Sequence, residues 1–248
     1  MQIHVFIQAR IGSNRLPKKI LKKICNKTII ELIVERVNQI EGIDKIFVLT
    51  GPKNKNLELI KEVKRLGISY YCGKEENILD RFYNGAKEFK SDIIIRVTGD
   101  SPLIDPKLIS KGLDIFKESN CDVLSINRFK TFPYGINFEI FSINALEQSW
   151  KDISKKYSQE EFEKMFIPPT KHMLENKKFE NYDLKNDEDL SSIRITLDYL
   201  EDLQLIEKLF EEFYSKNKYF DFKNIVDYLN KNPELNKLNK KYVHNYNK

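Results

Sequence analysis

The 248-residue chain has no hydrophobic run approaching a membrane span, and it is poor in cysteine and histidine. A helix needs about 20 consecutive apolar residues to cross a bilayer, so we expect no membrane span. Its three cysteines, Cys25, Cys72 and Cys121, are odd in number and far apart. They favour free thiols in a reducing cytoplasm over disulfides or zinc. The three histidines are equally scattered, so a His-based metal centre or catalytic triad has little support.

Positive charge is in slight excess, and the excess belongs to one segment. The net charge is +5, and residues 216–248 contain eight lysines against three acids, so the rest of the chain is balanced. A basic tail can contact nucleic acid or anionic lipid, but it is more often a solvated helical end. We therefore expect no nucleic-acid partner.

Short apolar runs alternate with helical periodicity over the first half of the chain. Strands are expected at residues 3–7, 44–50, 68–72, 92–97 and 121–126, and helices at 28–40, 57–66, 78–89 and 106–117. This alternation predicts an α/β fold with a mostly parallel sheet and helices on both faces. Asp105 and Pro106 suit the cap and first position of the fourth helix.

The regular alternation ends after residue 126. Further strands are expected at 136–141, 179–184 and 192–196, and helices at 144–150, 157–176 with a break at Pro168 and Pro169, 198–214 and 222–230. We expect a single domain over residues 1–215, followed by a basic helical tail at 216–248. Within the domain, residues 128–185 are expected to form a smaller lobe on the acceptor side or a dimerisation arm.

The loop after the first expected strand is strongly basic. It contains Arg10, Arg15, Lys18 and Lys19, and no acid occurs before Glu31. Arginine and lysine bind phosphate oxygens, and such a loop at the carboxyl end of a strand is where open α/β sheets bind ligands. The spacing is neither that of a Walker loop nor G-x-G-x-x-G, which disfavours P-loop ATPases and ordinary dinucleotide folds. Charge alone leaves a polyphosphate cradle and a solvated basic surface both open.

Three stretches together resemble one enzyme family. Residues 9–19 read A-R-I-G-S-N-R-L-P-K-K, residues 98–105 read T-G-D-S-P-L-I-D, and residues 194–203 read R-I-T-L-D-Y-L-E-D-L. They resemble the A-R-x-x-S-x-R-L-P-x-K, G-D-x-P and R-x-T-x-D-T-P-E-D-L patterns of the cytidylyltransferases, in particular CMP-Kdo synthetase-like and SpsF-like spore-coat polysaccharide proteins. The resemblance implies a sheet of the nucleotide-diphospho-sugar transferase type.

The resemblance also implies an activity and a set of site residues. CMP would pass from CTP to an acidic sugar or related acceptor, with release of pyrophosphate, and we expect a homodimer. Mg²⁺ would be bound by Asp100 and Asp198, which with Arg10 and Lys19 form the catalytic set. Nucleotide-binding residues would be Ala9, Arg10, Gly12, Ser13, Arg15, Lys19, Asp80, Arg81 and Thr98, and acceptor-binding residues Arg128, Tyr134 and Glu139.

Several alternatives remain open. Asp100 can simply form a turn, Asp198 can cap a helix, and Asp80 with Arg81 can form a surface pair on a helix. Lys18 stands where relatives usually have glycine, and Tyr199-Leu200 replaces the usual Thr-Pro. A glycosyltransferase with a similar sheet, or a non-catalytic nucleotide-binding protein, are the competing functions.

Overall fold

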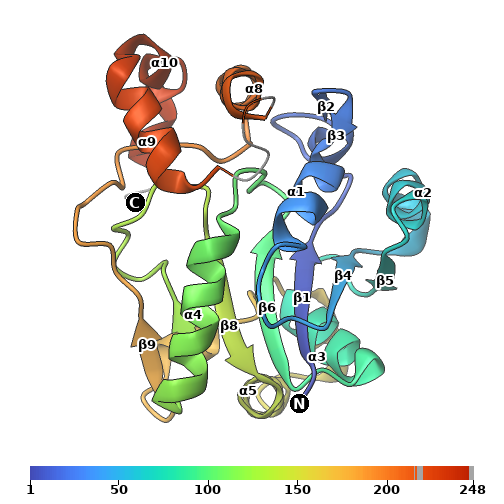
Figure 1. Cartoon of the computed structure of the whole chain (residues 1–248). Helices are drawn as coiled ribbons and strands as arrows, with labels where there is room; N and C mark the ends of the chain where they lie inside the picture. The colour runs from blue at the N-terminus through green and yellow to red at the C-terminus, as the bar shows by residue number, and fades with distance from the viewer. Residues whose placement is uncertain (215, 217–219, 246–248) are drawn as a thin grey trace.

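A seven-stranded sheet forms the centre of the protein (Figure 1). The computed structural model describes residues 1–214, 216 and 220–245. The strand order is β5-β4-β1-β6-β8-β7-β9. The strands are β1 (Ile3–Gln8), β4 (Lys45–Thr50), β5 (Ser69–Cys72), β6 (Ile93–Thr98), β7 (Val123–Ser125), β8 (Phe138–Ser142) and β9 (Asn181–Asp183). Within this sheet only β8 runs antiparallel to its neighbours, β6 and β7, so the predicted mostly parallel α/β fold is confirmed.

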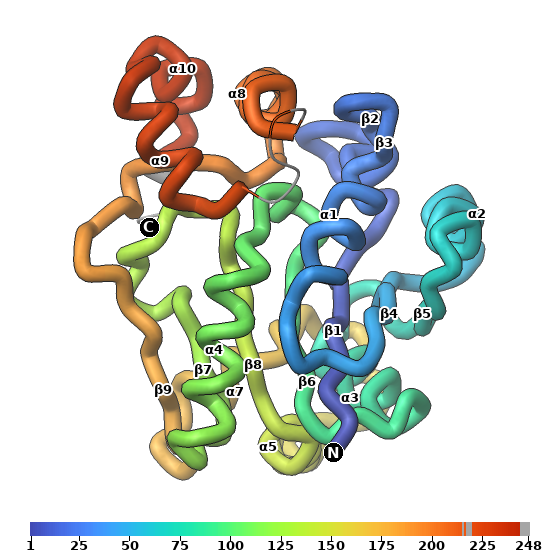
Figure 2. The backbone as a smooth tube through the Cα atoms, in the orientation of Figure 1, coloured from blue at the N-terminus to red at the C-terminus, as the bar shows by residue number. Residues whose placement is uncertain are grey.

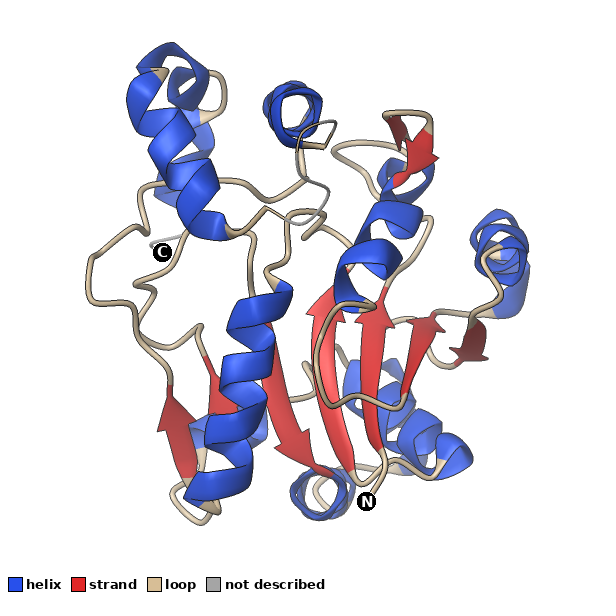
Figure 3. Cartoon of the chain, viewed as in Figure 1, coloured by secondary structure: helices blue, strands red, loops and turns tan. Residues whose placement is uncertain are grey.

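Helices cover both faces of the sheet because alternate residues of its central strands point to opposite sides. Val5 and Ile7 of β1 join the buried cluster that includes α1 and α4, whereas Phe6 joins the one that includes α3 and α5. Figure 3 shows α1 and α4 in front of the strands and α3 behind them. The α-helices in residues 1–154 are α1 (Ile29–Val37), α2 (Leu57–Arg65), α3 (Ile78–Phe89), α4 (Pro106–Ser119) and α5 (Ile143–Ser154).

Polar caps fix where several of these helices begin. The Thr28 hydroxyl accepts a hydrogen bond from the Glu31 amide at the start of α1, as expected of an N-cap. The Asp105 carboxylate caps α4 by accepting from the Leu108 amide, and Pro106 occupies the first turn. Both predicted starts are confirmed, and the bounds of α3 match those expected from its periodicity.

Residues 128–185 contribute β8 and β9 to the same sheet. They also form the helices α5, α6 (Gln159–Lys164) and α7 (Lys171–Glu175). The chain then returns to the carboxyl ends of the parallel strands, where α8 (Leu200–Phe213), α9 (Phe222–Lys231) and α10 (Pro233–Lys237) gather (Figure 2). A 3₁₀ turn, η3 (Lys240–Asn245), follows. Among the described residues, no helix is both long and apolar enough to cross a membrane.

The structure differs from the sequence-based description at two places. Residues 192–196 form no strand, because the pairing there is limited to a single bridge between Tyr134 and Arg194. Before α1 the chain forms a small hairpin, β2 (Lys23–Ile24) and β3 (Lys27–Thr28), rather than a loop. Its turn residues, Cys25 and Asn26, both have positive φ.

Candidate active site

A pocket of about 1000 Å³ lies at the carboxyl ends of β1 and β6. The segments that follow β1, β4, β5 and β6 line it, together with Phe166, Pro168 and Asp198, the last just before α8. Its charged lining residues are Arg10, Arg15, Lys19, Lys55, Arg81, Arg96, Glu75, Glu76, Asp100 and Asp198. Cations outnumber acids in this set, so the pocket as a whole favours an anionic ligand.

The loop after β1 is held to the neighbouring β4 and α2 segments by two hydrogen bonds. The Ala9 amide donates to the Leu49 carbonyl over 3.1 Å. The Ile11 amide donates to Oδ1 of Asn56, a buried residue, over 2.9 Å. A Cβ atom on Gly12 would have no atom within 4 Å, so the loop leaves open space there. The Ser13 hydroxyl accepts from the Leu16 amide over 3.4 Å, and Ser13 lines the pocket.

Lys19 lies between the two candidate metal ligands. Its Nζ donates to Oδ1 of Asp198 and to the Leu197 carbonyl, each over 2.8 Å. The same nitrogen is 3.7 Å from Oδ2 of Asp100. Arg15 Nη2 is 2.9 Å from Oδ1 of Asp198. The structure therefore brings the two cations of the first loop to two acids that lie about 80 and 180 residues further along the chain.

Asp100 is positioned by contacts between three separate segments. The Thr98 hydroxyl donates to Oδ1 of Asp100 over 2.5 Å. The Asp100 carbonyl accepts from the Leu197 amide and the Thr196 hydroxyl, over 2.8 and 3.0 Å. A Cβ on Gly99 would lie 3.2 Å from the Gln8 carbonyl oxygen. The turn after β6 therefore packs closely against β1 on one side and the start of α8 on the other.

Asp198 was expected either to cap a helix or to face the metal site. The structure shows that its side chain does not cap α8. Instead, the Asp202 carboxylate accepts hydrogen bonds from the amides of Asp198 and Tyr199 at the start of α8. The Asp198 side chain is thus free to face Lys19 and Arg15. Burial raises its pKa, but the charges of Lys19, Arg15 and Arg194 outweigh that effect and hold the pKa below its usual range.

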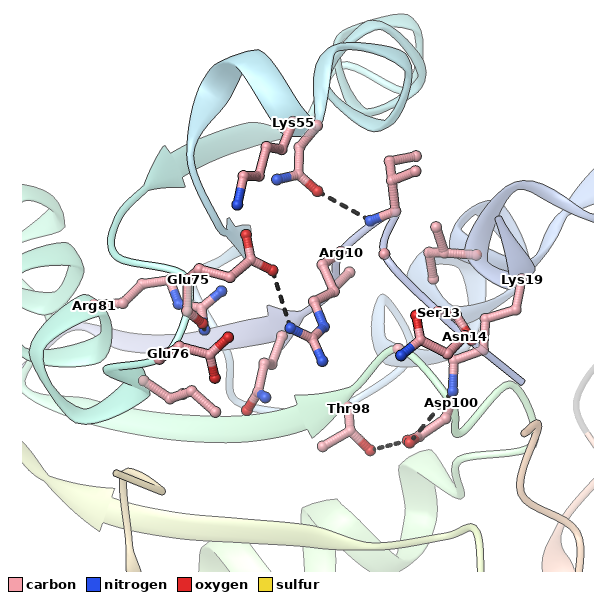
Figure 4. A pocket seen from close by; sticks show the side chains of 18 of the residues that line it. Arg10, Ser13, Asn14, Lys19, Lys55, Glu75, Glu76, Arg81, Thr98 and Asp100 are labelled. Carbon is pink, nitrogen blue, oxygen red and sulfur yellow. Dashed lines mark hydrogen bonds and ion pairs between the residues drawn. The ribbon is translucent and has the colours of Figure 1, made fainter. Parts of the chain in front are cut away.

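The other end of the pocket is formed by Arg10 and the segment between β5 and α3. Arg10 Nη1 donates to Oε1 of Glu75 over 2.9 Å. Figure 4 shows Arg10, Glu75, Glu76 and Arg81 on one side of the pocket, with Ser13, Lys19, Thr98 and Asp100 on the other. Arg81 is 2% exposed. Burial lowers its pKa to about 10, which still leaves the guanidinium charged at neutral pH.

Four predicted site residues do not line the pocket. Asp80 instead accepts a hydrogen bond from Trp150 Nε1 over 2.9 Å. Arg128 pairs with Asp183 over 3.2 Å. The remaining two are Glu139, which binds the lining residue Arg96, and Tyr134.

Glu139 is buried and bound by three side chains. It accepts from Arg96 Nη1 over 2.6 Å, from the Thr170 hydroxyl over 2.8 Å and from Asn127 Nδ2 over 3.2 Å. The Tyr134 backbone is hydrogen-bonded to Ile193 and Ile195. Burial, together with the charges of Asp100 and Asp198, raises the pKa of its side chain. Its ring lies 5.2 Å from the Arg194 guanidinium carbon. The following position, 135, accommodates only glycine, because a Cβ there would lie 2.4 Å from the Thr196 nitrogen.

Several lining residues were missed by sequence reasoning, and three of them, Arg96, Asn56 and Glu75, make polar contacts that shape the site. Arg96 donates from Nε to Oε1 of Gln8 over 3.0 Å as well as to Glu139. The sequence did carry a signal for Arg96, because it is the single charged residue inside the apolar run of β6. Asn56 and Glu75 carried no comparable signal, because their contacts to residues 10 and 11 are set by the packing of β4 and β5 beside β1.

The acid pair fits a divalent cation such as Mg²⁺. The donors are carboxylate oxygens from two loops, and Mg²⁺ usually takes one or two protein carboxylates together with phosphates and water. Among the described residues, no cluster of three or more acid, cysteine or histidine side chains forms a complete metal-binding cage. Such a cation would therefore need oxygens from a bound ligand.

Comparisons with known proteins relate the chain to one family. The family model described as Cytidylyltransferase matches residues 4–241. The chain is 34% identical to Uncharacterized protein MJ1063 of Methanocaldococcus jannaschii, over 96% of this chain and 95% of that protein. It is 32% identical to the spore coat polysaccharide biosynthesis protein SpsF of Bacillus subtilis, over 56% of this chain and 59% of that one.

A solved structure extends the similarity to the whole fold. A cytidylyltransferase from Leptospira borgpetersenii superposes with a TM-score of 0.82 at 29% identity, covering 95% of this chain and 96% of that one. The three stretches that resembled the family lie within the matched residues, and the fold brings all three to one pocket. The chain therefore belongs to the cytidylyltransferase family.

Proposed function

We propose that the chain transfers CMP from CTP to a hydroxyl of an acidic sugar or related acceptor. The acceptor oxygen forms a bond to the α-phosphorus, and the bond from that phosphorus to the bridging oxygen breaks. Pyrophosphate leaves with the bonding electrons, and the hydroxyl proton passes to solvent. The observation that carries this proposal is the acid pair Asp100 and Asp198 beside Lys19 and Arg15, in a pocket lined by the basic loop.

In this proposal the protein positions the reactants and balances charge. Phosphoryl-type transfer depends mainly on in-line placement and on neutralising the phosphate oxygens. Arg10, Arg15 and Lys19 would bind the triphosphate through charge-assisted hydrogen bonds, with Ser13 as a further donor. Asp100 and Asp198 would hold Mg²⁺, which when bound supplies charge stabilisation to the phosphate and acceptor oxygens.

The residues that bind the acceptor are proposed from where they lie in the structure. Tyr134 is hydrogen-bonded to the backbone just before Asp198, at Ile193 and Ile195, and Glu139 orients Arg96, which lines the pocket. An acidic acceptor would suit the guanidinium of Arg96, which lines the pocket. Arg128 stays a prediction, because its guanidinium pairs with Asp183 and does not line the pocket.

A pyrophosphate-release screen tests the proposal. CTP, UTP, ATP and GTP would be offered with Mg²⁺ against a panel of acidic sugars, and calorimetry would rank the binding of the four nucleotides. We expect release only with CTP and an acidic acceptor. Tighter binding of UTP or ATP would contradict the nucleotide assignment. Binding of CTP without turnover on any acceptor would favour a non-catalytic protein, and turnover of a nucleotide sugar would favour a glycosyltransferase.

Two finer points also belong to the proposal. The three cysteines are free thiols, which supports a reducing compartment, and we propose that the enzyme is cytoplasmic. The homodimer stays a prediction, which light scattering of the purified chain tests.

A further inference from the structure

The C-terminal segment of the described chain packs onto the start of α8, next to the candidate metal ligand Asp198. Asn239 and Tyr242, from the turn after α10 and from η3, make the contacts. Asn239 is 1% exposed. Figure 2 shows α8, α9 and α10 side by side above the carboxyl ends of the strands.

Asn239 acts on the carboxylate that organises the start of α8. Its Nδ2 donates to Oδ1 of Asp202 over 2.8 Å and to the Arg194 carbonyl over 3.0 Å. Asp202 is fully buried and also accepts two hydrogen bonds from the Arg194 guanidinium, over 2.9 and 2.7 Å. The same carboxylate binds the Asp198 amide over 2.9 Å. A buried carboxylate keeps its place only while such donors remain, so Asn239 helps to fix the backbone of Asp198.

Tyr242 acts on the phosphate-binding side through the ring of Tyr199. Its ring lies parallel to that of Tyr199, with centroids 3.7 Å apart. The Arg15 guanidinium carbon lies 5.0 Å from the Tyr199 ring centroid, within the range of a cation–π contact. Tyr199 is also one of the two residues that replace the Thr-Pro of the family pattern. The ring beside Arg15 therefore departs from the family pattern, and it packs in turn against Tyr242.

We propose that Asn239 and Tyr242 are positioning residues of the active site, Asn239 through Asp202 toward Asp198 and Tyr242 through Tyr199 toward Arg15. The inference rests on the proposed function, because it assigns Asp198 and Arg15 their roles in binding Mg²⁺ and triphosphate. The basic C-terminal segment thereby becomes part of the catalytic unit. The pair between Lys241 and Glu201 beside it is largely exposed on the lysine side and adds little.

The test uses the full chain with point substitutions. Tyr242→Ala removes the ring, and Tyr242→Phe keeps the ring but loses the hydroxyl that donates to Glu201. Asn239→Ala removes the amide from Asp202. Lys240→Ala, an exposed residue between them, is the matched control.

The variants are expected to separate two effects. With Tyr242→Ala, the KM for CTP should rise about 2- to 10-fold, the range that corresponds to losing one aromatic contact, while kcat at saturating CTP stays within about twofold. Tyr242→Phe and Lys240→Ala should match the parent. With Asn239→Ala, Mn²⁺ binding followed by electron paramagnetic resonance should weaken, and the Mg²⁺ concentration for half-maximal rate should rise.

The outcomes distinguish this inference from the proposed function. Tyr242→Ala with a lower melting temperature but an unchanged KM for CTP shows a structural role only and overturns the inference, even if Asn239→Ala fails to fold. If the parent chain releases no pyrophosphate from any nucleotide, the proposed function fails. The positioning itself is then measured by amide hydrogen exchange of residues 194–203, which Tyr242→Ala must accelerate and Lys240→Ala must not.

Discussion

Replacing Lys19 with alanine removes the ammonium group that joins the two acids of the pocket. Nζ of Lys19 is 2.8 Å from Oδ1 of Asp198 and 3.7 Å from Oδ2 of Asp100, and its side chain is 16% exposed. In the proposed reaction this cation also faces the leaving pyrophosphate, where charge increases in the transition state. Losing a hydrogen bond to a charged group costs about 1.5–3 kcal/mol, so kcat/KM should fall roughly 10- to 150-fold.

The neighbouring lysine provides a matched control. Nζ of Lys18 is 2.7 Å from Oε1 of Glu58, both side chains are more than half exposed, and neither lines the pocket. Exposed pairs of this kind contribute only about 0.2–1 kcal/mol to stability. Lys18→Ala should therefore change kcat/KM by no more than about twofold.

The assay is steady-state pyrophosphate release with varied CTP at saturating Mg²⁺ and acceptor. Arg15→Ala, which removes the second cation from Asp198, should lower kcat/KM by roughly 1–3 kcal/mol in the same assay. Melting temperatures of all variants separate lost chemistry from lost fold. If Lys18→Ala is the most damaging of the three, then the loop register and the site built on it are refuted.

Four further predictions follow from individual residues. Asp100→Asn should lower kcat at least about 100-fold, or ~3 kcal/mol, with little change in melting temperature; near-normal turnover at saturating Mg²⁺ contradicts a ligand role. Gly12→Ala should fold normally, since its Cβ would meet no atom within 4 Å, yet weaken CTP binding in calorimetry if phosphate approaches that backbone; unchanged affinity argues against it. Lys18→Gly should raise the free energy of unfolding in urea by about 1 kcal/mol, because Lys18 has a φ of 52°; a less stable variant contradicts this. Asp198 has a lowered pKa in the folded state, so its stabilising contribution should be complete above its unfolded pKa of about 3.9 and be lost as the pH falls through the folded value. Asp198→Asn should therefore weaken the dependence of the free energy of unfolding on pH in this acid range. An unchanged dependence on pH assigns the effect to other groups.

Elements with strong local signals could be predicted from the sequence. The helix α3 was expected at its observed bounds because its periodicity is long, and Asn77 accepts from the Asp80 amide at its start. The central strands β1 and β6 were expected from apolar runs that the sheet buries on both faces. By contrast, β2 and β3 are two residues each, too short to carry any periodicity.

The candidate site was most directly predictable where residues lie in loops after strands. Asp100 follows β6 and Arg10 follows β1, so their meeting at one sheet edge follows from topology. The side chain of Asp80 could not be placed in this way, because its contact with Trp150 depends on how α3 packs against α5. The usual glycine at position 18 was a further signal, since the positive φ of Lys18 explains that preference in relatives.

The pairing of charges explains why the first loop has no acid of its own. Each of its pocket-lining cations pairs with a carboxylate from a distant segment: Arg10 with Glu75, Arg15 with Asp198, and Lys19 with Asp198 and Asp100. An acid within the loop would compete for those cations locally and leave the loop free to move away from β6 and α8. With acids from three separate segments, the cations are instead held over one pocket, with their positions set by the sheet. Cations held in this way are preorganised for a phosphate chain, because their positions are set by carboxylates outside the loop.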